Sequence, residues 1–328
     1  MAHYAVVLLN LGGPDSLDAI EPFLRNLFSD CDIFKIPVGQ KLFAKMIAKA
    51  RAPKVTERYK KIGGKSPINE WTDIQAKNLK NALQKESRDI EVHVGMRYWR
   101  PAIKDVAGRL SEKDADKIVL LPLYPQYSIT TTGSSFREWQ RAYSGPPARL
   151  VYIDHYYENE KYIAAINQRI DEAILRFPEP AKDDIQIVFS AHGTPQRLVN
   201  QGDPYSSQIK KTIESVMAKR SFDYPHHLCF QSKVGPLQWL KPSTHETLTS
   251  LATKHKKQIL MVPISFVSDH IETLFELEIE YRDVAVNAGI ENYVVMKGLN
   301  DSDLFISALK DITMQALNID TVKPDTNG

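Results

Sequence analysis

The stretch Ala5-Val-Val-Leu-Leu9, followed by Asn10-Leu-Gly-Gly-Pro14, decides the fold class of this chain. A continuous apolar run, without polar residues at alternate positions, is typical of a strand covered on both faces, as in a parallel sheet. The Gly and Pro residues that follow end the strand. The same pattern recurs along the chain, at 91–95, 118–123, 185–189, 228–230 and 259–266.

Helical segments separate these runs. Apolar residues recur with helical spacing at 71–85, 158–177, 206–219, 242–255 and 301–316, with Asp301 as the predicted N-cap of the last segment. Strands that alternate with helices predict βαβ units and an α/β fold with parallel sheets. Three strands fall in each half, so we predict two similar α/β domains joined near Tyr143-Ser-Gly-Pro-Pro147. The predicted boundaries are 1–146 plus 300–328 for the first domain, onto which the last helix packs back, and 147–299 for the second.

Composition excludes several classes of protein. The 328 residues are 43% hydrophobic and 25% charged, with a formal net charge of +2 and Lys and Arg spread along the chain, so we expect no nucleic-acid partner. No stretch approaches the ~20 apolar residues of a spanning helix, and the N-terminus lacks the basic start of a signal peptide. We therefore expect a cytoplasmic protein. Cys31 and Cys229 are too far apart in the sequence to suggest a disulfide framework, a Cys-ligated zinc site or an iron–sulfur cluster.

His192 stands at the end of a predicted strand, within Ser190-Ala-His-Gly-Thr-Pro195. Ligands of open α/β sheets bind beyond the carboxyl ends of the strands, so this side chain is well placed to face a cleft. An imidazole can accept a proton or bind a metal near neutral pH. The alternative is a histidine that only hydrogen-bonds the turn, and the motif alone leaves both interpretations open.

An acidic segment follows the last of the predicted strands. Glu272, Glu276 and Glu280 fall at i, i+4 and i+8, and Asp269 lies one turn earlier, so all four line one face of a helix. The simpler alternative is a solvated acidic face. However, 268–281 contains no Lys or Arg, so repulsion between these carboxylates is uncompensated within the segment. We interpret the row as a path for cations or protons.

The segment 33–51 predicts a basic amphipathic helix. Lys41, Lys45 and Lys49 share one face, and the other face carries Leu42, Phe43, Met46 and Ile47. Such a helix lies on a membrane surface or forms the rim of an apolar pocket, or it is an ordinary surface helix.

Four segments together resemble the ferrochelatase family. They are Leu9-Asn-Leu-Gly-Gly-Pro14, Tyr124-Pro-Gln-Tyr-Ser128 with Thr131-Thr-Gly-Ser-Ser135, Ser190-Ala-His-Gly193, and the acidic segment from Ser268 to Tyr281. Ile62-Gly-Gly-Lys-Ser-Pro67, Gly202-Asp-Pro-Tyr205 and Gln231-Ser-Lys-Val-Gly-Pro236 are also similar. The resemblance implies two Rossmann-like domains with a porphyrin in the cleft between them. It implies a lyase that inserts Fe²⁺ into protoporphyrin IX to form protohaem, with release of two protons, as the last step of haem biosynthesis.

The resemblance also implies roles for particular residues. His192 and Glu272 face each other across the porphyrin and carry the metal and proton chemistry, although the division of roles between them stays open. The implied substrate-binding residues are Leu11, Arg51, Tyr59, Ser66, Tyr124, Trp239 and Phe266. Asp269, His270, Glu276 and Glu280 form the implied proton or metal path.

The expected partners are therefore protoporphyrin IX and Fe²⁺, with Fe²⁺ as a substrate, no permanently bound cofactor and no iron–sulfur cluster. The apolar 33–51 segment resembles the pocket lip of family members that use protoporphyrin, and it predicts weak, reversible contact with a membrane surface. Two alternatives remain: a chelatase for another metal or tetrapyrrole, and a porphyrin or haem carrier without turnover. A carrier has no need of the Glu272, Glu276 and Glu280 row.

Overall fold

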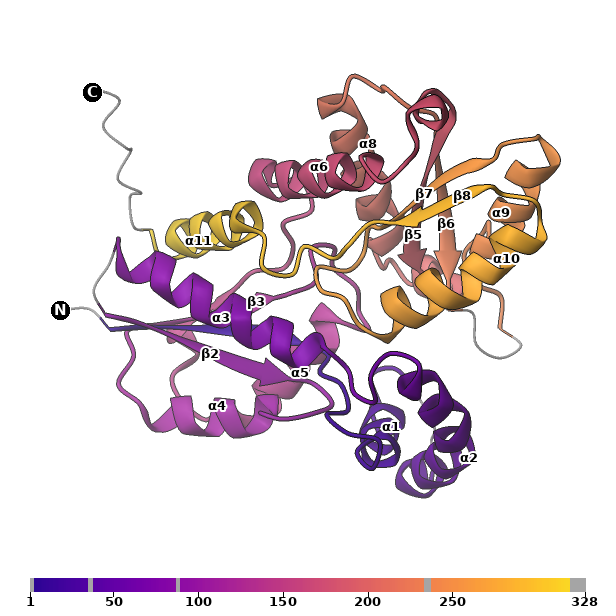
Figure 1. The fold of residues 1–328 in the computed structure, drawn as a ribbon. Helices are drawn as coiled ribbons and strands as arrows, with labels where there is room; N and C mark the ends of the chain where they lie inside the picture. Colours follow the sequence, from indigo (N-terminus) through magenta and orange to yellow (C-terminus); the bar gives the residue numbers. More distant parts are fainter. Residues whose placement is uncertain (1–2, 35–37, 87–88, 233–236, 319–328) are drawn as a thin grey trace, which may run out of the picture.

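The structure of the chain is a computed structural model that describes residues 3–34, 38–86, 89–232 and 237–318 (Figure 1). Within these residues, eight strands form two parallel sheets. The first sheet has the order β2-β1-β3-β4 and the second β6-β5-β7-β8. The strands are β1 (Tyr4–Asn10), β2 (Ile90–Met96), β3 (Lys117–Pro122), β4 (Leu150–Tyr152), β5 (Ile185–His192), β6 (His226–Gln231), β7 (Gln258–Pro263) and β8 (Asn292–Val295). The predicted α/β class with two parallel sheets is confirmed.

Helices connect the strands and cover the sheets. In the first half they are α1 (Ile20–Phe28), α2 (Gln40–Lys60), α3 (Ile68–Gln84), α4 (Ile103–Glu112) and α5 (Thr132–Ala142). In the second half they are α6 (Glu160–Ile174), α7 (Gln196–Asn200), α8 (Tyr205–Lys219), α9 (Thr244–Thr253), α10 (Tyr281–Asn287) and α11 (Asp303–Leu317). Two 3₁₀ segments, η1 (Pro147–Arg149) and η2 (Glu179–Asp184), and a π-helix, η3 (Glu272–Glu280), complete the fold. Figure 1 shows α1 and α2 set apart from the first sheet.

Three details of the predicted elements were wrong. Each sheet contains a fourth strand that the sequence did not reveal, because β4 and β8 are only three and four residues long. The run 259–266 does not remain a strand to its end, since β7 stops at Pro263. The N-cap of α11 is Ser302, whose side chain accepts a hydrogen bond from the N–H of Phe305, whereas Asp301 pairs with Arg169 at 3.2 Å.

One continuous apolar core joins the two sheets. It contains Val6 and Leu121 from the first sheet together with Ile187 and Leu260 from the second, and it extends over α6 and α11. Helix α11 contacts both halves: Lys310 pairs with Glu86, two residues after α3, and Lys161 of α6 donates to Ser307. The predicted boundaries between the domains stay a prediction.

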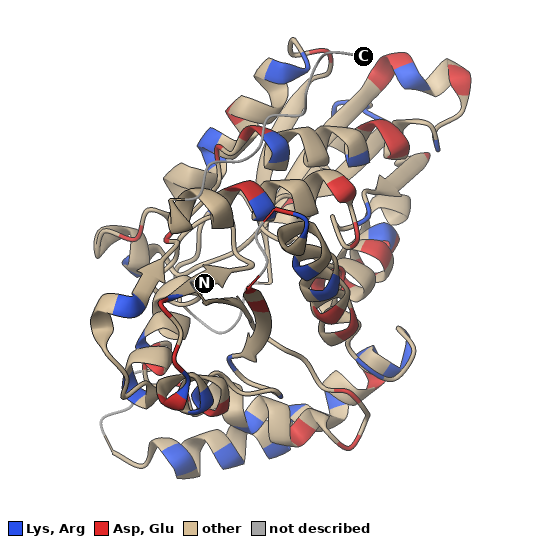
Figure 2. Ribbon diagram, turned by 90° about the vertical axis from the view of Figure 1, so that its left-hand side faces the viewer, with Lys and Arg blue, Asp and Glu red and all other residues tan. Residues whose placement is uncertain are grey.

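Charged residues of both signs are interspersed over the helices of both halves, as Figure 2 shows. Among the described residues, no helix combines the length and the apolar character that crossing a membrane requires.

Candidate active site

A cavity of about 130 Å³ opens where the carboxyl ends of the two sheets meet. Residues that follow β1 and β3 line one side, and residues that follow β5 and β7 line the other, as expected for ligand sites of parallel sheets. Most of the surface area that the lining residues expose to the cavity is apolar. The lining residues are Asn10, Leu11, Ile68, Leu123, Tyr124, Gln126, Ser128, Thr130, Thr131, His192, Thr194, Tyr205, Ser265, Phe266, Val267, Ser268, His270 and Glu272.

His192 and Glu272 are the chemically most capable pair in this cavity. Nδ1 of His192 lies 2.9 Å from Oε2 of Glu272. Because an ionised carboxylate only accepts hydrogen bonds, Nδ1 carries the proton in this pair. Among the residues that the structure describes, Nε2 has no hydrogen-bond partner, and the side chain is 39% exposed. The ring therefore offers a free nitrogen to the cavity.

The glycine after His192 allows β5 and β6 to lie close together. A Cβ atom at Gly193 would stand 2.6 Å from the carbonyl oxygen of Gln231 and 3.2 Å from the ring of Trp239. The N–H of Gly193 donates to that same carbonyl. The Ser-Ala-His-Gly motif thus places the histidine at the last position of β5, where its backbone is still part of the sheet.

The two side chains change each other's pKa. Burial alone lowers the pKa of His192, but the charge and hydrogen bond of Glu272 outweigh it, and the pKa is raised above its ordinary value of 6.5. Burial alone raises the pKa of Glu272, but His192 and then His270 outweigh it, and that pKa is lowered. The pair favours an ionised carboxylate beside an imidazole that is more basic than a free histidine.

The acidic segment forms a π-helix and not the α-helix that its spacing predicted. π-Helices are rare in proteins, and those that do occur are often found at functional sites. Phe275 and Leu277 are buried, while Glu272, Glu276 and Glu280 lead outward from the cavity. Burial and the neighbouring Glu272 raise the pKa of Glu276 to about 7.

Repulsion along the row is compensated from outside the segment. Arg58 of α2 lies 3.7 Å from Glu276 and 3.3 Å from Glu280. The hydroxyl of Ser232 donates to Glu276 as well. The first half of the chain therefore supplies the cation that the sequence of 268–281 lacks.

Asp269 does not share the face of the acidic row, because it precedes the π-helix and points into the protein. Its carboxylate accepts hydrogen bonds from the hydroxyl of Thr273, the N–H of Gly298 and the amide of Asn300. His270 does lie beside the row. Its Nε2 is 3.7 Å from Glu272, and its ring packs on Phe266 with the centroids 4.5 Å apart.

The structure brings three of the seven predicted substrate-binding residues to the cavity: Leu11, Tyr124 and Phe266. Tyr59 and Ser66 lie buried beside it, near enough to Glu272 that burial and then this carboxylate raise the pKa of Tyr59. Arg51 stacks on Phe28 in the α1–α2 region, 5.7 Å from the ring centroid.

Trp239, the last of the predicted substrate-binding residues, does not line the cavity that contains His192. It lies against Gly193 and lines a separate cavity of about 610 Å³ beside β6. Residues 233–236 of the Gln231-Ser-Lys-Val-Gly-Pro236 stretch lie outside the described residues.

Helix α2 differs from the predicted amphipathic pattern. Its buried residues are Ala44, Ala48 and Tyr59. Leu42 and Met46 are each 64% exposed and share the solvent side with Lys41 and Lys45. The apolar residues of the predicted lip therefore divide between the inner side and the surface, with Ile47 partly buried against the α1–α2 core.

Two residues that contact His192 were not found from the sequence. Tyr205 donates its hydroxyl to the carbonyl oxygen of His192 at 3.0 Å, and Ser265 accepts the N–H of His192 at 3.0 Å. Tyr205 ends the Gly202-Asp-Pro-Tyr205 stretch, which was the available signal. Ser265 stands within an apolar run, and no sequence motif marked it as a site residue.

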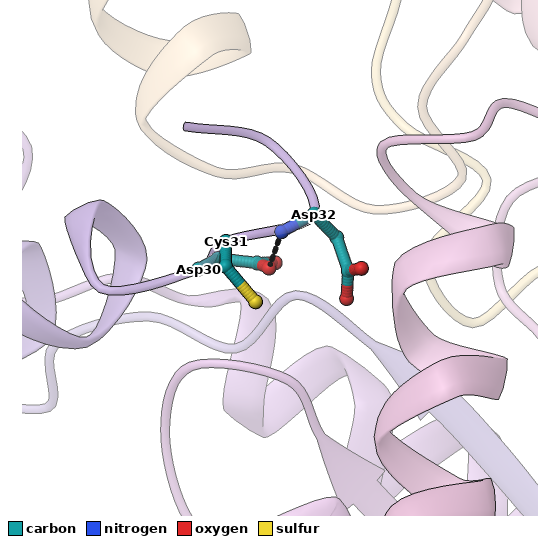
Figure 3. A group of neighbouring side chains, drawn as sticks. All are labelled: Asp30, Cys31 and Asp32. Carbon is teal, nitrogen blue, oxygen red and sulfur yellow. Dashed lines mark hydrogen bonds between the residues drawn. The ribbon is translucent and has the colours of Figure 1, made fainter. Parts of the chain in front are cut away.

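A second polar cluster follows α1. Figure 3 shows Asp30, Cys31 and Asp32, whose potential metal-ligating atoms lie within 4.8 Å of one another. The carboxylate of Asp30 is fully buried and accepts hydrogen bonds from Tyr98 and Ser134, each at 2.6 Å.

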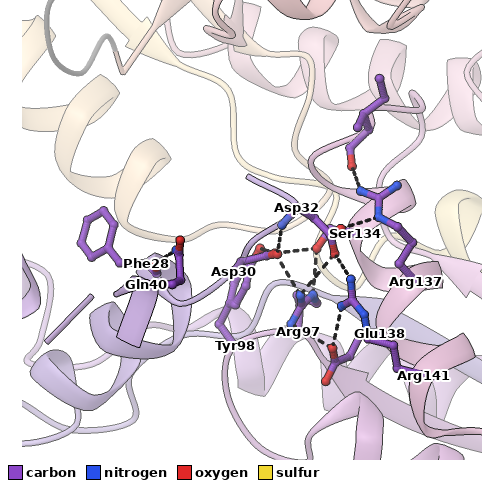
Figure 4. A network of polar contacts seen from close by, with 11 residues as sticks. Phe28, Asp30, Asp32, Gln40, Arg97, Tyr98, Ser134, Arg137, Glu138 and Arg141 are labelled. Atoms are coloured by element: carbon purple, nitrogen blue, oxygen red, sulfur yellow. Dashed lines mark hydrogen bonds and ion pairs between the residues drawn. The ribbon is translucent and has the colours of Figure 1, made fainter. Parts of the chain in front are cut away.

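Arginine side chains neutralise this cluster, as Figure 4 shows. Arg97 pairs with Asp30 at 3.0 Å, and Arg137 and Arg141 pair with Asp32 at 2.7 and 2.8 Å. Burial alone raises the pKa of Asp30, but these hydrogen bonds and Arg97 outweigh it, and the pKa is lowered. The oxygens are thus engaged in a network that ties the α1–α2 region to α5.

Comparison with known proteins gives a consistent result. A family model described as ferrochelatase matches residues 3–317. A ferrochelatase from Gloeobacter violaceus is 44% identical over 326 residues, covering 97% of this chain and 99% of its own. A ferrochelatase from Aquifex aeolicus is 46% identical over 310 residues, covering 94% of this chain and 97% of its own.

Solved structures share the fold at low sequence identity. The sirohydrochlorin chelatase SirB from Bacillus subtilis subspecies spizizenii, in complex with cobalt, has a TM-score of 0.55 at 12% identity and covers 96% of both chains. CbiX, described as the terminal enzyme of sirohaem biosynthesis in denitrifying bacteria, has a TM-score of 0.53 at 12% identity, covering 95% of this chain and 98% of its own.

Proposed function

The chain belongs to the ferrochelatase family and is a metal chelatase of the last step of haem synthesis, and on this premise we propose that His192 and Glu272 carry out the insertion of Fe²⁺ into protoporphyrin IX. The observation that carries the proposal is the 2.9 Å contact between Nδ1 of His192 and Oε2 of Glu272 in the cavity at the carboxyl ends of both sheets.

The apolar lining of the cavity suits a porphyrin ring. Leu11, Tyr124 and Phe266 offer apolar and aromatic surface, which contributes roughly 25 cal/mol per Å² buried. The nitrogens of a flat porphyrin are poor acids and cannot enclose a metal easily, so insertion needs a distorted ring. Binding of the rest of the ring to a shaped surface supplies such strain. A cavity of about 130 Å³ holds only part of a macrocycle, so the remainder lies outside it.

The pair supplies the base that the reaction needs. Two pyrrole N–H bonds break as Fe²⁺ forms bonds to the four nitrogens, and both protons must leave. Glu272 holds the proton on Nδ1 of His192, so that Nε2 is the nitrogen that faces the substrate. When Nε2 is unprotonated it can take a pyrrole proton, and the Glu272 carboxylate stabilises the resulting imidazolium.

We propose that the protons leave, or the metal arrives, along Glu272, Glu276 and Glu280. Glu276 supports this role because its pKa of about 7 lets it gain and lose a proton at neutral pH. Carboxylates and imidazole also bind divalent iron without a change in its oxidation state. Asp269 has a different task, since its three hydrogen bonds fix the start of the π-helix.

The porphyrin preference is inferred from the lip. Leu11 faces the cavity, and Phe34 and Ile47 are partly buried in the neighbouring α1–α2 core. These apolar groups suit the vinyl edge of protoporphyrin IX better than the additional propionates of coproporphyrin. We also propose weak membrane contact through α2, where Leu42 and Met46 stand exposed among lysines.

Purified protein incubated anaerobically with protoporphyrin IX and Fe²⁺ tests the activity through the change in the visible spectrum. We expect multiple turnovers of metalloporphyrin. Binding without turnover would favour a carrier, and insertion of another metal alone would favour a different chelatase. Stoichiometric iron and sulfide in the purified protein would contradict the expected lack of an iron–sulfur cluster.

A further inference from the structure

Strand β5 extends beyond the end of one of its neighbours. Ser190 is the last residue of β5 paired with β7, opposite Pro263, and the N–H of Ile264 donates to the carbonyl of Ser190. The N–H groups of Ile187 in β5 and of Gly193 directly after it bond toward β6, so odd-numbered residues face that side. The N–H and C=O of His192 therefore face the side of β7, beyond the point where β7 ends.

Two side chains take the place of the missing strand. The hydroxyl of Ser265 accepts the N–H of His192, and the hydroxyl of Tyr205 donates to its carbonyl oxygen, both at 3.0 Å. Unpaired backbone groups would allow the peptide to rotate and would be costly to bury. His192 is thus held on this side by groups from the loop after β7 and from α8.

Hydrogen bonds through Asp203 link Tyr205 to the first half of the chain. Asp203 is buried, and its carboxylate accepts the N–H of Tyr205 at 3.0 Å. Its other oxygen accepts the hydroxyl of Ser128 at 2.8 Å and the N–H of Ile129 at 3.0 Å. Ser128, which follows β3, and Tyr205, the first residue of α8, both line the cavity.

We infer that Tyr205 is a positioning residue for the metal-insertion reaction, and that with Asp203 it forms a brace that fixes His192 relative to the 128–129 segment of the first half. This inference rests on the proposed function of His192. The brace keeps the imidazole within hydrogen-bonding distance of Glu272 because it prevents rotation of the His192 peptide. Tyr205 acts through the backbone of His192 and not on the substrate's reacting atoms.

The test is Tyr205→Phe in the full chain, which removes the hydroxyl and keeps the ring. Tyr156→Phe is the matched control, since Tyr156 is also buried and its hydroxyl has no partner among the described residues. We expect kcat for Zn²⁺ insertion into protoporphyrin IX to fall roughly tenfold in Tyr205→Phe, about the effect of one hydrogen bond, with KM for the porphyrin changed less than about twofold.

A spectroscopic measurement does not depend on turnover. In ¹⁵N-histidine spectra, the Nδ1–H signal assigned to His192 by its loss in His192→Asn should broaden or disappear in Tyr205→Phe and persist in Tyr156→Phe. Asp203→Asn should weaken the signal as well, because its amide N–H₂ would oppose the N–H of Ile129. Ser265→Ala offers a further variant if Tyr205→Phe does not fold.

An unchanged kcat, a rise in KM alone, or a wild-type His192 signal in folded Tyr205→Phe would overturn the inference. Failure of the proposed function is distinguishable, because it would be seen as wild-type turnover in His192→Asn itself, whereas the Nδ1–H signal reports on the brace in either case.

Discussion

Nδ1 of His192 and Oε2 of Glu272 are 2.9 Å apart although the residues are separated by 80 positions in the sequence. One ends β5, and the other begins the π-helix after β7. Each shifts the pKa of its partner: Glu272 raises that of His192, and His192 lowers that of Glu272. The following predictions depend on this pair and on the residues that continue from it.

Replacement of His192 by Asn should nearly abolish metal insertion while porphyrin still binds. The loss should be about 10²–10⁴-fold, the usual contribution of general acid–base catalysis. Glu272→Gln should behave similarly, and the double mutant should be little worse than either, because residues that act as a unit are not additive. Stopped-flow insertion of Zn²⁺ and fluorescence titration of porphyrin measure the two effects separately. Wild-type turnover in His192→Asn would show that this histidine has only a structural role in the turn.

The rate of insertion should increase with pH. His192 must be unprotonated to take a pyrrole proton, and its pKa lies above 6.5, so the rate should rise through a midpoint above that value. In Glu272→Gln the carboxylate that raises this pKa is gone while burial still lowers it, so the midpoint of the residual activity should move to lower pH. The measurement is the pH profile of kcat at constant Zn²⁺. An unchanged midpoint would show that Glu272 does not raise the pKa of the group that controls the rate.

Glu276→Gln should lower metal insertion and leave stability equal or higher. Because folding raises the pKa of Glu276 from 4.5 to about 7, the carboxyl contributes stability below pH 4.5, and this contribution is lost as pH rises toward 7. The Glu276→Gln variant has no carboxyl to ionise at this position, so it does not lose this stability as pH rises. Its advantage in free energy of unfolding should therefore grow over this interval, by an amount on the order of 3 kcal/mol.

Urea denaturation at pH 4.5, 6 and 8 measures this difference for Glu276→Gln. Glu278→Gln is a suitable control, since Glu278 lies on the same segment but outside the Glu272, Glu276 and Glu280 row and pairs with Arg282. A large loss of stability with unchanged activity would favour the interpretation of a solvated acidic face.

Protoporphyrin IX should be a better substrate than coproporphyrin III, because the apolar groups near Leu11 accommodate vinyl groups more readily than carboxylates. The ratio of kcat/KM for the two porphyrins measures the preference. Leu11→Gln should reduce it by roughly fivefold, as expected for about 1 kcal/mol of apolar contact. Faster turnover of coproporphyrin III by the wild-type chain would reverse the assignment.

Exposed side chains of α2 should support binding to anionic vesicles. Leu42→Ser with Met46→Ser should weaken co-sedimentation with phosphatidylglycerol vesicles several-fold, since both residues are 64% exposed. Turnover of detergent-solubilised porphyrin should change little. Val286→Ser is the control, because Val286 is similarly exposed, at 60%, on a different helix. Equal vesicle binding by all the variants would show that α2 is an ordinary surface helix.

Local patterns predicted the fold class and marked candidate residues, whereas the pairing of His192 with Glu272 was implied only by the resemblance to the ferrochelatase family. Continuous apolar runs identified six of the eight strands in the described residues. Strands β4 and β8 were missed because three or four residues carry too little pattern. A spacing of four also could not distinguish an α-helix from the π-helix that formed.

The remaining site residues depend on contacts that no local pattern encodes. Arg58 reaches Glu280 across 222 positions, so the acidic segment looked uncompensated when read alone. Tyr205 and Ser265 contact His192 only because β5 extends beyond β7, and this offset is a property of strand register. Tyr59, Ser66 and Arg51 do not line the cavity, and Tyr59 instead packs in the α1–α2 core.

The continuous core between the sheets has a consequence for folding cooperativity. Val6 and Leu121 belong to the same apolar cluster as Ile187 and Leu260, and α11 returns from the end of the chain to join it. Neither half can then lose its packing without exposing the apolar surface of the other, so chemical denaturation should follow one sigmoidal transition at any probe position. A gene cut near residue 146 should yield two fragments that aggregate when expressed singly and recover soluble structure when they are produced together.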